Sequence, residues 1–363
     1  MNTTCKIKYN YEFKPKIRAG YIGCGGHSYR NILPAFQFAP IELIATCDLD
    51  AKRAATFARM FGAESFYSDY HEMLECEDLH AVFVVTDYNE KHEPRYPEIA
   101  IDVMRAGCHA WIEKPPAASS KQIRDMMKVE KQSGRFTMVG FKKMFFPAIQ
   151  ELKHIISRKE FGKAGSIYLK YPQSIPPDDK RKDAKAMKWF LDHIVHPSSI
   201  IQFLMGPVES VYFQRSVTGD GAITMRFVSG AAGVLHLSAG CSYTGPLERV
   251  EVIGEKANVV VENGIRLIYY RKGNRGAGGY SHGSSYIGKL NEAPICWEPE
   301  FSLGETSNKA IFLLGYVGEI LEFCNCVLKN KKPEICGLSD ALEIMKFYEA
   351  FKNPSGKIIK INK

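Results

Sequence analysis

The sequence predicts two domains: a doubly wound α/β domain, then an α+β domain built on an open, mostly antiparallel sheet. Apolar strand patterns alternate with helical patterns between residues 17 and 140, as in a parallel sheet with crossover helices. After Gly165, short strand patterns follow one another without crossover helices, so the second sheet should be mixed or antiparallel, with helices on one face. A chain of 363 residues is long enough for two such domains, which we place at 1–140 and 141–363.

The first domain is expected to alternate strand and helix throughout. The apolar run from Ala81 to Thr86 is continuous, which is typical of a strand buried on both faces. Capping signals mark the helices, such as Ser119 or Ser120 at the start of one and Gly107 at the end of another. After a first strand that begins at residue 17, the expected strands are 41–47, 63–67, 81–86, 109–112 and 135–140, and the expected helices are 29–38, 51–61, 70–75, 97–106 and 120–133.

A glycine-rich turn follows the first expected strand. It has the spacing of the dinucleotide-binding fingerprint, Gly23-x-Gly25-x-x-Ser28, with a small serine in the third position. The first glycine permits the tight turn, the second lets the backbone approach a pyrophosphate, and the third residue must be small so that the helix packs on the strand. Free N–H groups at the start of the helix would then meet the phosphates. The motif predicts a Rossmann domain whose cofactor-binding residues include Gly23, Cys24, Gly25, Gly26, His27 and Ser28.

Asp48 ends the second expected strand, 25 residues after Gly23. A carboxylate at this position can accept hydrogen bonds from both hydroxyls of the adenosine ribose and would repel a 2′-phosphate. It therefore predicts NAD as the cofactor, with NADP less favoured. Lys52 and Arg53, just downstream, could serve a 2′-phosphate if they fold back. A structural role is also open for Asp48, as the N-cap of the helix at 51–61.

A proline-stiffened turn follows the expected strand at 109–112. It reads Glu113-Lys114-Pro115-Pro116, and Lys114 cannot belong to a helix because a proline disfavours helical backbone at the residue before it. If the turn closes a strand at the carboxyl edge of a parallel sheet, the Lys114 ammonium points into the crevice where such folds bind ligands. For the tripeptide alone, a solvated lysine on a surface turn is the alternative interpretation.

These residues together resemble the Gfo/Idh/MocA oxidoreductases, NAD(P)-dependent dehydrogenases that act mostly on sugars, cyclitols and nucleotide sugars. The shared features are the glycine turn, Asp48, and the Glu113-Lys114-Pro115 turn with the helix after it. The segment Gly140–Ala148 resembles the family's G-(F/Y)-N-x-R-(F/Y)-x-P segment, and residues 189–196 resemble its D-x-G-x-H signature. The resemblance covers nearly the whole chain after residue 17.

The resemblance implies roles for three groups of residues. The polar catalytic positions are held by Lys114, Asp192 and His196. The positions expected near the nicotinamide are held by Thr86, Glu113 and Lys114. The polar and basic positions that line the substrate site are held by Lys142 and Lys143.

The chain departs from the family pattern in three places. Ile194 stands where the D-x-G-x-H signature has its glycine, and Ser199 replaces the acid that often follows the histidine. After the strand at 81–86, the family's T-P-x-x-x-H is replaced by an insertion, Tyr88–Arg95. The reaction class is compatible with these changes, and the substrate stays open.

Oxidation of a secondary alcohol needs a base for the hydroxyl proton. A lysine beside the positive nicotinamide ring and shielded from water should have a lowered pKa, which suits proton transfer. His196 is the rival for this role, and Asp192, four residues away on the same helix face, would orient the substrate or His196. Two other interpretations are a structural His196 and a metal site of Asp192, His193 and His196. We expect no metal, because two of these three residues face apart.

The second domain is expected to contain strands at 166–171, 208–215, 222–228, 233–239, 250–254 and 258–261, and helices at 306–330 and 338–351. The stretch 274–288 is rich in Gly and Ser, and it could be a surface loop or a lid that brings Tyr280 to the substrate. An open sheet with one uncovered face needs a partner, so we expect a homodimer or homotetramer through that face.

Composition bounds the remaining classes of function. The net charge of +8 is spread along the chain without a basic block, so we expect no nucleic-acid partner. No apolar run reaches membrane-spanning length and no signal peptide is evident, so we expect no membrane partner. The ten cysteines lack framework spacing and are interpreted as reduced thiols in a cytoplasmic protein.

The leading hypothesis is an NAD-dependent dehydrogenase that oxidises a secondary alcohol of a sugar, sugar derivative or cyclitol. One alternative is transient oxidation with retained NAD, used for epimerisation or glycosidic cleavage. Another is a non-catalytic NAD-binding regulator of the same fold. Phosphorylation of the substrate stays open, since several cations could serve an anion or face water, namely Lys142, Lys143, Arg181 and Lys182.

Overall fold

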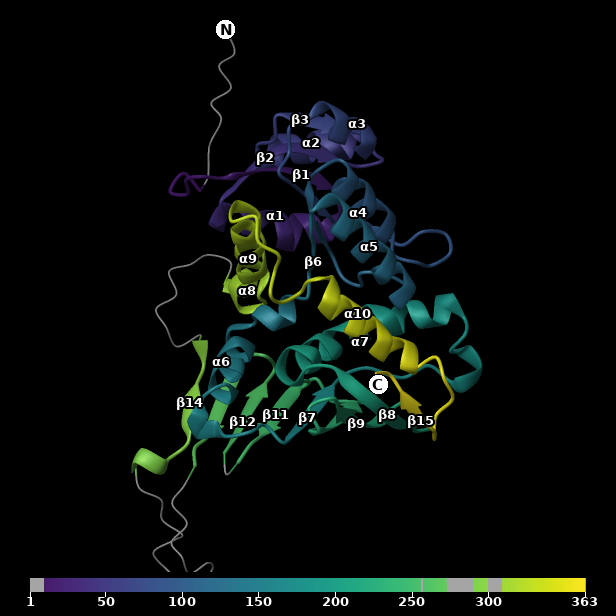
Figure 1. Cartoon of the computed structure of the whole chain (residues 1–363), viewed down its shortest axis with the longest axis vertical. Helices are drawn as coiled ribbons and strands as arrows, with labels where there is room; N and C mark the ends of the chain where they lie inside the picture. The colour runs from purple at the N-terminus through teal and green to yellow at the C-terminus, as the bar shows by residue number, and fades with distance from the viewer. Residues whose placement is uncertain (1–9, 256, 273–289, 300–308, 363) are drawn as a thin grey trace, which may run out of the picture. The chain divides into compact units, whose positions relative to one another are not determined.

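The computed structural model describes residues 10–255, 257–272, 290–299 and 309–362 (Figure 1). The chain divides into two compact units. The first ends at Lys142 and also takes in Ala310–Lys346, and the second runs from Lys143 to Lys309 and resumes at Phe347. The sequence division at 140/141 therefore falls close to the first crossing between the units, but it did not include Ala310–Lys346 with the first unit.

The first unit contains a six-stranded sheet whose strand pairs are all parallel. The strand order is β3-β2-β1-β4-β5-β6, so the chain builds outward from β1 in one direction and then restarts at β4 on its other side. The bounds are β1 Ile17–Ile22, β2 Ile41–Cys47, β3 Ser65–Tyr67, β4 Ala81–Val84, β5 His109–Ile112 and β6 Thr137–Val139. The predicted doubly wound parallel sheet is confirmed, and the loops after β1 and β4 lie at the point where such sheets bind ligands.

Capping residues begin and end the helices of the first unit. Asp50 accepts hydrogen bonds from two backbone N–H groups of α2, Asp69 caps α3, and Ser119 caps α5 as its sequence position predicts. Gly134 ends α5 in the left-handed conformation. The helices are α1 Leu33–Ala35 between π turn Ser28–Ile32 and 3-10 turn Phe36–Phe38, α2 Ala51–Phe61, α3 Tyr70–Cys76, α4 Tyr96–Arg105 and α5 Ser120–Ser133.

Two helices from late in the chain, α8 Lys309–Leu313 and α9 Tyr316–Leu328, complete the first unit apart from the start of α10. The sequence predicts one helix over 306–330. Residues 306–308 lie outside the described residues, and the described part of this prediction is wrong between α8 and α9. Gly315 has φ +76°, a conformation that ends α8 and precedes α9. The α9 helix contacts β1 and buries Tyr316, Glu319 and Phe323.

His109 in β5 is a buried histidine that should make the first unit sensitive to acid. Its Nδ1 accepts a hydrogen bond from the Phe136 N–H at 3.2 Å, and the two rings pack with centroids 4.0 Å apart. Burial, reinforced by the charges of Arg135 and His80, lowers its pKa from 6.5 to about 4. The unfolded chain therefore binds this proton more tightly, so stability is full above pH 6.5 and is lost as the pH falls toward 4.

We expect this group to remove about 3 kcal/mol from the unfolding free energy between pH 7 and pH 4. Urea unfolding measured at both pH values should show the loss in the natural chain. In His109→Gln, which keeps a hydrogen-bond acceptor but cannot titrate, the loss should be smaller by that amount. An equal pH dependence in the two proteins would show that His109 is not held neutral.

The second unit contains a nine-stranded mixed sheet in the order β14-β13-β12-β11-β7-β10-β9-β8-β15. Only the β7–β10 pair is parallel among the described strands of this sheet, and the other pairs are antiparallel. The bounds are β7 Ser166–Tyr171, β8 Val208–Arg215, β9 Gly221–Phe227, β10 Ala232–Leu237, β11 Arg249–Ile253, β12 Asn258–Glu262, β13 Arg266–Tyr270, β14 Ile295–Trp297 and β15 Ile358–Lys360. The last three strands were not predicted.

One face of this sheet packs against helices, as predicted. Alternate residues are buried along β7, β9 and β10, and α6 contacts β12 and β13 while α7 contacts β7. The α-helices are α6 Pro147–Ile156, α7 Ala184–Met205 and α10 Leu338–Ala350, the last running across the third boundary, where the chain returns to the second unit at Phe347. Short 3-10 turns occupy Lys142–Phe145, Lys159–Phe161, Asp178–Lys180 and Leu290–Glu292.

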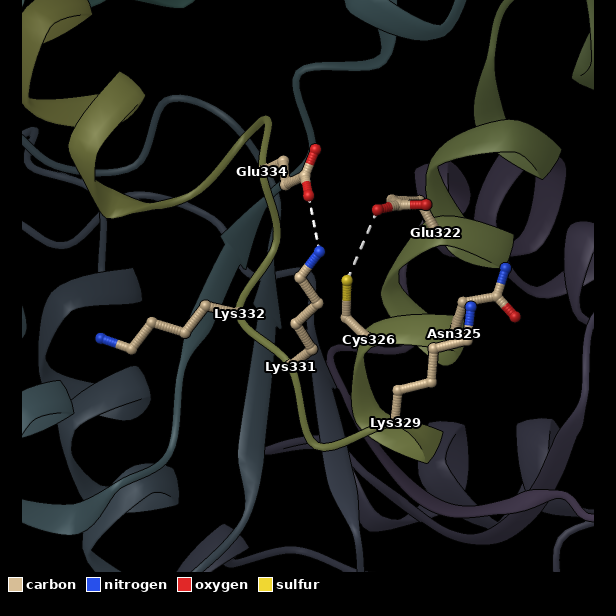
Figure 2. A pocket seen from close by; sticks show the side chains of 7 residues that line it. All are labelled: Glu322, Asn325, Cys326, Lys329, Lys331, Lys332 and Glu334. Carbon is tan, nitrogen blue, oxygen red and sulfur yellow. Dashed lines mark hydrogen bonds and ion pairs between the residues drawn. The ribbon is translucent and has the colours of Figure 1, made fainter.

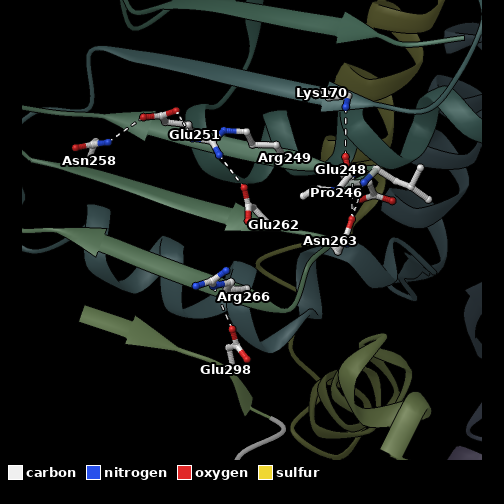
Figure 3. Close-up of polar contacts among 11 residues, drawn as sticks. Lys170, Pro246, Glu248, Arg249, Glu251, Asn258, Glu262, Asn263, Arg266 and Glu298 are labelled. Carbon is white, nitrogen blue, oxygen red and sulfur yellow. Dashed lines mark hydrogen bonds and ion pairs between the residues drawn. The ribbon is translucent and has the colours of Figure 1, made fainter. Parts of the chain in front are cut away.

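Polar pairs run along strands β11, β12 and β13 near one end of the open sheet (Figure 3). Arg249 contacts Glu262 at 2.8 Å and Glu251 at 3.1 Å, and Arg266 on β13 contacts Glu298 at 3.1 Å. The predicted association of copies through the open face remains a prediction.

Within the described part of the chain, no helix has both the length and the apolar character to cross a membrane. Nine of the ten cysteines lie there, and all nine are free thiols.

Candidate active site

The glycine turn after β1 is shaped by two glycines with different surroundings. Gly23 has φ +97°, and a Cβ on it would lie 1.9 Å from the carbonyl oxygen of Val85, so only glycine fits between the loops after β1 and β4. A Cβ on Gly25 would meet no described protein atom within 4 Å. Ser28 Oγ donates to the Gly23 carbonyl at 2.6 Å and is fully buried, so its smallness and its hydroxyl both hold the turn.

Asp48 follows β2 and reaches back to the glycine turn. Its Oδ2 accepts a hydrogen bond from the Cys24 N–H at 2.8 Å, and its Oδ1 accepts one from the Asp50 N–H at 2.9 Å. The N-cap role that the sequence left open belongs to Asp50 instead. The Asp48 side chain is 11% exposed, and each oxygen retains a lone pair for a further donor. Arg53 lies 3.8 Å from Asp48 Oδ1.

Thr86, just after β4, has a buried hydroxyl with no hydrogen-bond partner among the described residues. Its carbonyl oxygen accepts from the Tyr96 hydroxyl at 2.8 Å. The insertion that follows folds on itself, because the Asn89 side-chain oxygen accepts from the N–H groups of Lys91 and Glu93. Buried polar atoms are normally paired, so an orphan hydroxyl at the switch point of the sheet indicates a place for a ligand atom.

The turn after β5 is tied to the glycine turn through one carboxylate. Glu113 is 4% exposed, and its Oε1 lies 2.9 Å from Nε2 of His27 while its Oε2 accepts from the Lys114 N–H at 2.9 Å. The Asn31 side-chain amide lies 3.0 Å from His27 Nδ1. With Asn31 as donor there, His27 is the tautomer that donates from Nε2 to Glu113. Both ring nitrogens of His27 are therefore engaged within the protein. In the same turn as Glu113, the Lys114–Pro115 peptide is cis.

These loops fit a dinucleotide. They follow β1, β2, β4 and β5 at one edge of the parallel sheet, and the space over Gly25 is open to an approaching pyrophosphate. Asp48 presents a partly accessible carboxylate beside the turn, and the Thr86 hydroxyl lacks a partner in the described chain. The predicted cofactor contacts of the individual residues remain predictions.

The sequence interpretation missed a cluster that α9 contributes to the first unit. Lys142 donates to the Tyr316 hydroxyl at 2.7 Å, and the Tyr316 ring lies 5.9 Å from that of His27. Glu319, one turn later, is fully buried, and neither carboxyl oxygen has a hydrogen-bond partner in the described chain. Burial raises the Glu319 pKa well above its usual value, and the nearby charge of Glu113 adds to this. The sequence did contain one signal for this cluster, because Glu319 is an acidic residue among the apolar residues of a predicted helix.

In the second unit, α7 carries two of the three predicted catalytic residues, Asp192 and His196. The His196 ring lies 6.4 Å from the ring of Tyr171, the last residue of β7, and 6.5 Å from that of His193. Tyr171 is buried, and its pKa is raised by that burial and by the charges of Glu248 and Asp192. Tyr171 is therefore a site candidate that the sequence did not single out.

Lys143 is buried in the same unit and forms an ion pair with Glu248. Its ammonium also lies 5.0 Å from the centre of the Tyr171 ring and 5.4 Å from that of Phe146. Burial lowers the Lys143 pKa, and the Glu248 charge opposes this shift. We call Lys143, Tyr171, Asp192, His196 and Glu248 the Tyr171 cluster. Glu248 lies 105 residues from Lys143, so no local pattern could have paired them.

Other predicted positions do not join these clusters or cannot be placed. Tyr280 lies outside the described residues. The Arg181 guanidinium is 1% exposed and contacts the carbonyl oxygens of Pro176 and Asn353 and the carboxylate of Asp178, so it serves the fold. Within the described chain, no group of three or more His, Cys, Asp and Glu side chains is arranged to hold a metal ion.

A small surface cavity lies at the carboxyl end of α9 (Figure 2). None of its lining residues is a predicted site residue. Two of its lysines are already paired, Lys331 with Glu334 at 2.6 Å and Lys332 with Glu130 at 2.5 Å. Cys326 in its wall has a pKa raised to about 12 by burial and by Glu322, so its thiol is unreactive near neutral pH. The cavity is not a second candidate site.

Comparisons with known proteins agree with this geometry. The family model described as "Oxidoreductase family, NAD-binding Rossmann fold" matches residues 17–141, and the GFO/IDH/MocA C-terminal domain model matches residues 149–260. Myo-inositol 2-dehydrogenase of Thermotoga maritima is 27% identical over 262 residues, which is 68% of this chain and 75% of that protein. A scyllo-inositol 2-dehydrogenase (NAD(+)) of Bacillus subtilis is 26% identical over 264 residues, covering 68% and 74%.

A solved structure supports the fold. The NAD-binding oxidoreductase from Klebsiella pneumoniae has a TM-score of 0.76 to this chain at 19% identity, covering 96% of this chain and 99% of that one. At this identity the likeness shows the fold alone. The two matching family models together span more than half of the sequence, and the chain therefore belongs to the Gfo/Idh/MocA family, as an oxidoreductase of CH–OH groups with an NAD-binding Rossmann domain.

Proposed function

We propose that the protein is an NAD-dependent dehydrogenase that oxidises a secondary alcohol of a sugar, sugar derivative or cyclitol. The observation that carries the proposal is the Asp48 carboxylate, held beside the glycine turn by the Cys24 N–H at 2.8 Å. From there it can accept ribose hydroxyls, and its charge would oppose a 2′-phosphate. Arg53, at 3.8 Å from Asp48, is already engaged by that carboxylate and by Asp50. The inositol dehydrogenases among the relatives support a cyclitol or sugar substrate.

The chain supplies the proton chemistry and the positioning. Bound NAD would supply the hydride acceptor. Lys114 or His196 would take the proton from the substrate hydroxyl, and Asp192 would orient the substrate or His196. Glu113 would hold the Lys114 backbone, because its carboxylate accepts a hydrogen bond from the Lys114 N–H at 2.9 Å. These roles follow from the family positions of the residues and from the local contacts in each unit.

A substrate panel tests the proposal. Purified protein would be mixed with NAD or NADP and a set of inositol isomers and aldoses, with reduced nucleotide followed by absorbance. We expect reduction of NAD with at least one cyclitol or sugar, and slower reduction of NADP. NAD that binds in calorimetry but is reduced by no member of the set would contradict the dehydrogenase. Tightly bound nucleotide released on denaturing the purified protein would favour the internal-redox alternative.

A further inference from the structure

With its histidine counted as neutral, the Tyr171 cluster carries more negative than positive charge. It contains one ammonium, on Lys143, and two carboxylates, on Glu248 and Asp192. The Lys143 side chain is 7% exposed, so its ion pair with Glu248 is poorly screened by solvent. A phosphate or carboxylate on a substrate would therefore meet a lysine whose charge is already compensated and a second acid nearby.

Glu248 is fixed where it neutralises Lys143. The Asn263 side-chain oxygen accepts hydrogen bonds from the N–H groups of Leu247 and Glu248, at 2.9 and 3.2 Å (Figure 3). In turn, the Asn263 N–H donates to the Glu248 carbonyl oxygen at 2.9 Å. The carboxylate thus stands on a segment secured to the end of β12, and the lysine it pairs with is held over two aromatic rings.

Tyr171 offers a hydrogen-bonding group suited to a neutral ligand. The residue is 5% exposed, and no hydrogen bond to its hydroxyl is found in the described part of the chain. Its raised pKa keeps the phenol protonated, so the hydroxyl can donate as well as accept. Carboxylates and a phenol together complement the vicinal hydroxyls of a polyol, because each hydroxyl both donates and accepts.

Other cations that the sequence offered for an anion are already engaged. Lys142 donates to Tyr316 within the first unit, and Arg181 is buried against Asp178 and two carbonyl oxygens. With Lys143 paired as well, three of the four candidate cations have internal partners.

We propose that Glu248 makes the enzyme selective for uncharged polyols by neutralising Lys143 and repelling anions, and that Tyr171 donates a hydrogen bond to a substrate hydroxyl. The substrate class is then free sugars and cyclitols, with their phosphate esters and acids excluded. This inference rests on the proposed dehydrogenase function. Glu248 acts through Lys143 and through its charge, so it is a positioning and selectivity residue.

Glu248→Gln tests the proposal, because glutamine keeps the size and one oxygen for Lys143 but removes the negative charge. Its matched control is Glu262→Gln, which removes a carboxylate paired with Arg249 on a neighbouring strand. For each protein, kcat/KM would be measured with myo-inositol and with myo-inositol 1-phosphate. Calorimetry of the NAD-loaded proteins with each ligand would measure binding without turnover.

We expect the natural chain to prefer myo-inositol, and Glu248→Gln to shift the ratio toward the phosphate ester by about tenfold or more, since like-charge juxtaposition at a binding site is costly. This shift in the ratio is expected whether Lys143 is already protonated in Glu248→Gln or becomes protonated when the phosphate ester binds. Adding Lys143→Met to Glu248→Gln should abolish the acquired phosphate binding. Glu262→Gln should leave the ratio unchanged.

The possible results distinguish failure of the selectivity inference from failure of the proposed dehydrogenase function. A natural chain that prefers the phosphate ester, or a Glu248→Gln ratio equal to that of Glu262→Gln, would overturn the selectivity inference while leaving the dehydrogenase intact. If neither ligand is oxidised by any variant, the proposed function with this substrate fails, and calorimetry of myo-inositol 1-phosphate still decides the charge effect. Thermal unfolding of each variant would show whether a change in binding reflects lost folding.

Discussion

Lys114→Ala is expected to lower turnover by about 10³-fold while NAD still binds, because proton transfer by a positioned side chain contributes factors of this size. The Lys114 backbone is held by Glu113 through an N–H bond that alanine preserves, so the turn itself should survive. Turnover would be measured with the substrate identified in the panel, and NAD affinity by calorimetry. The control is Lys121→Ala, which removes an exposed lysine paired with Asp125 and should leave both quantities unchanged.

Two results would contradict the role of Lys114. Turnover within tenfold of the natural chain would transfer the proton role to His196, the rival base. A parallel loss of NAD binding and of turnover would instead show that the lysine serves the cofactor. A pH profile of kcat distinguishes these cases further, because loss of the base should remove its limb from the profile.

Alanine at Gly23 and alanine at Gly25 are expected to fail in different ways. At Gly23 the new Cβ would lie 1.9 Å from the Val85 carbonyl oxygen at φ +97°, so the loops after β1 and β4 must separate. We expect Gly23→Ala to destabilise the first unit by roughly 3–5 kcal/mol, the range of severe single substitutions. Urea unfolding followed by circular dichroism would measure this loss.

Gly25→Ala should keep the stability of the natural chain, because its Cβ meets no described protein atom within 4 Å. If the space over Gly25 is where the pyrophosphate approaches, the methyl group should weaken NAD binding by about tenfold or more. Calorimetry of NAD binding measures this effect. Equal stability of the two variants would refute the steric argument at Gly23, and natural NAD affinity in Gly25→Ala would move the pyrophosphate elsewhere.

The first sheet could be predicted because its signals are local. The strand 109–112 and the helix 120–133 are found at those bounds, since a buried apolar run, a capping serine and a terminal glycine each act within a few residues. Asp48 and the Gly23 turn were likewise recognisable by spacing along the chain. The N-cap of α2 was offered to Asp48, although Asp50 directly precedes the helix predicted at 51–61 and is the residue that caps it.

The features that were missed depend on residues far apart in sequence. The strands β14 and β15 have three residues each and lie at the two edges of their sheet, too short for a period to appear. His27 meets Glu113 across 86 residues and Lys143 meets Glu248 across 105, so no local pattern could pair them. Gly315 was not recognised as a break, although an isolated glycine near the end of a helical pattern can end a helix.

The Glu113 carboxylate gives the cofactor site a mechanical property beyond its charge. One oxygen holds the imidazole of the glycine turn and the other holds the amide of the lysine that follows. The two turns are therefore linked by hydrogen bonds to a single buried carboxylate. If one turn moves, the hydrogen bond to the other is strained. A pyrophosphate bound at the glycine turn would restrain the lysine turn before any substrate arrives. Loss of either hydrogen bond would disturb both turns. The losses of NAD affinity caused by substitutions at His27 and at Glu113 should therefore not be additive.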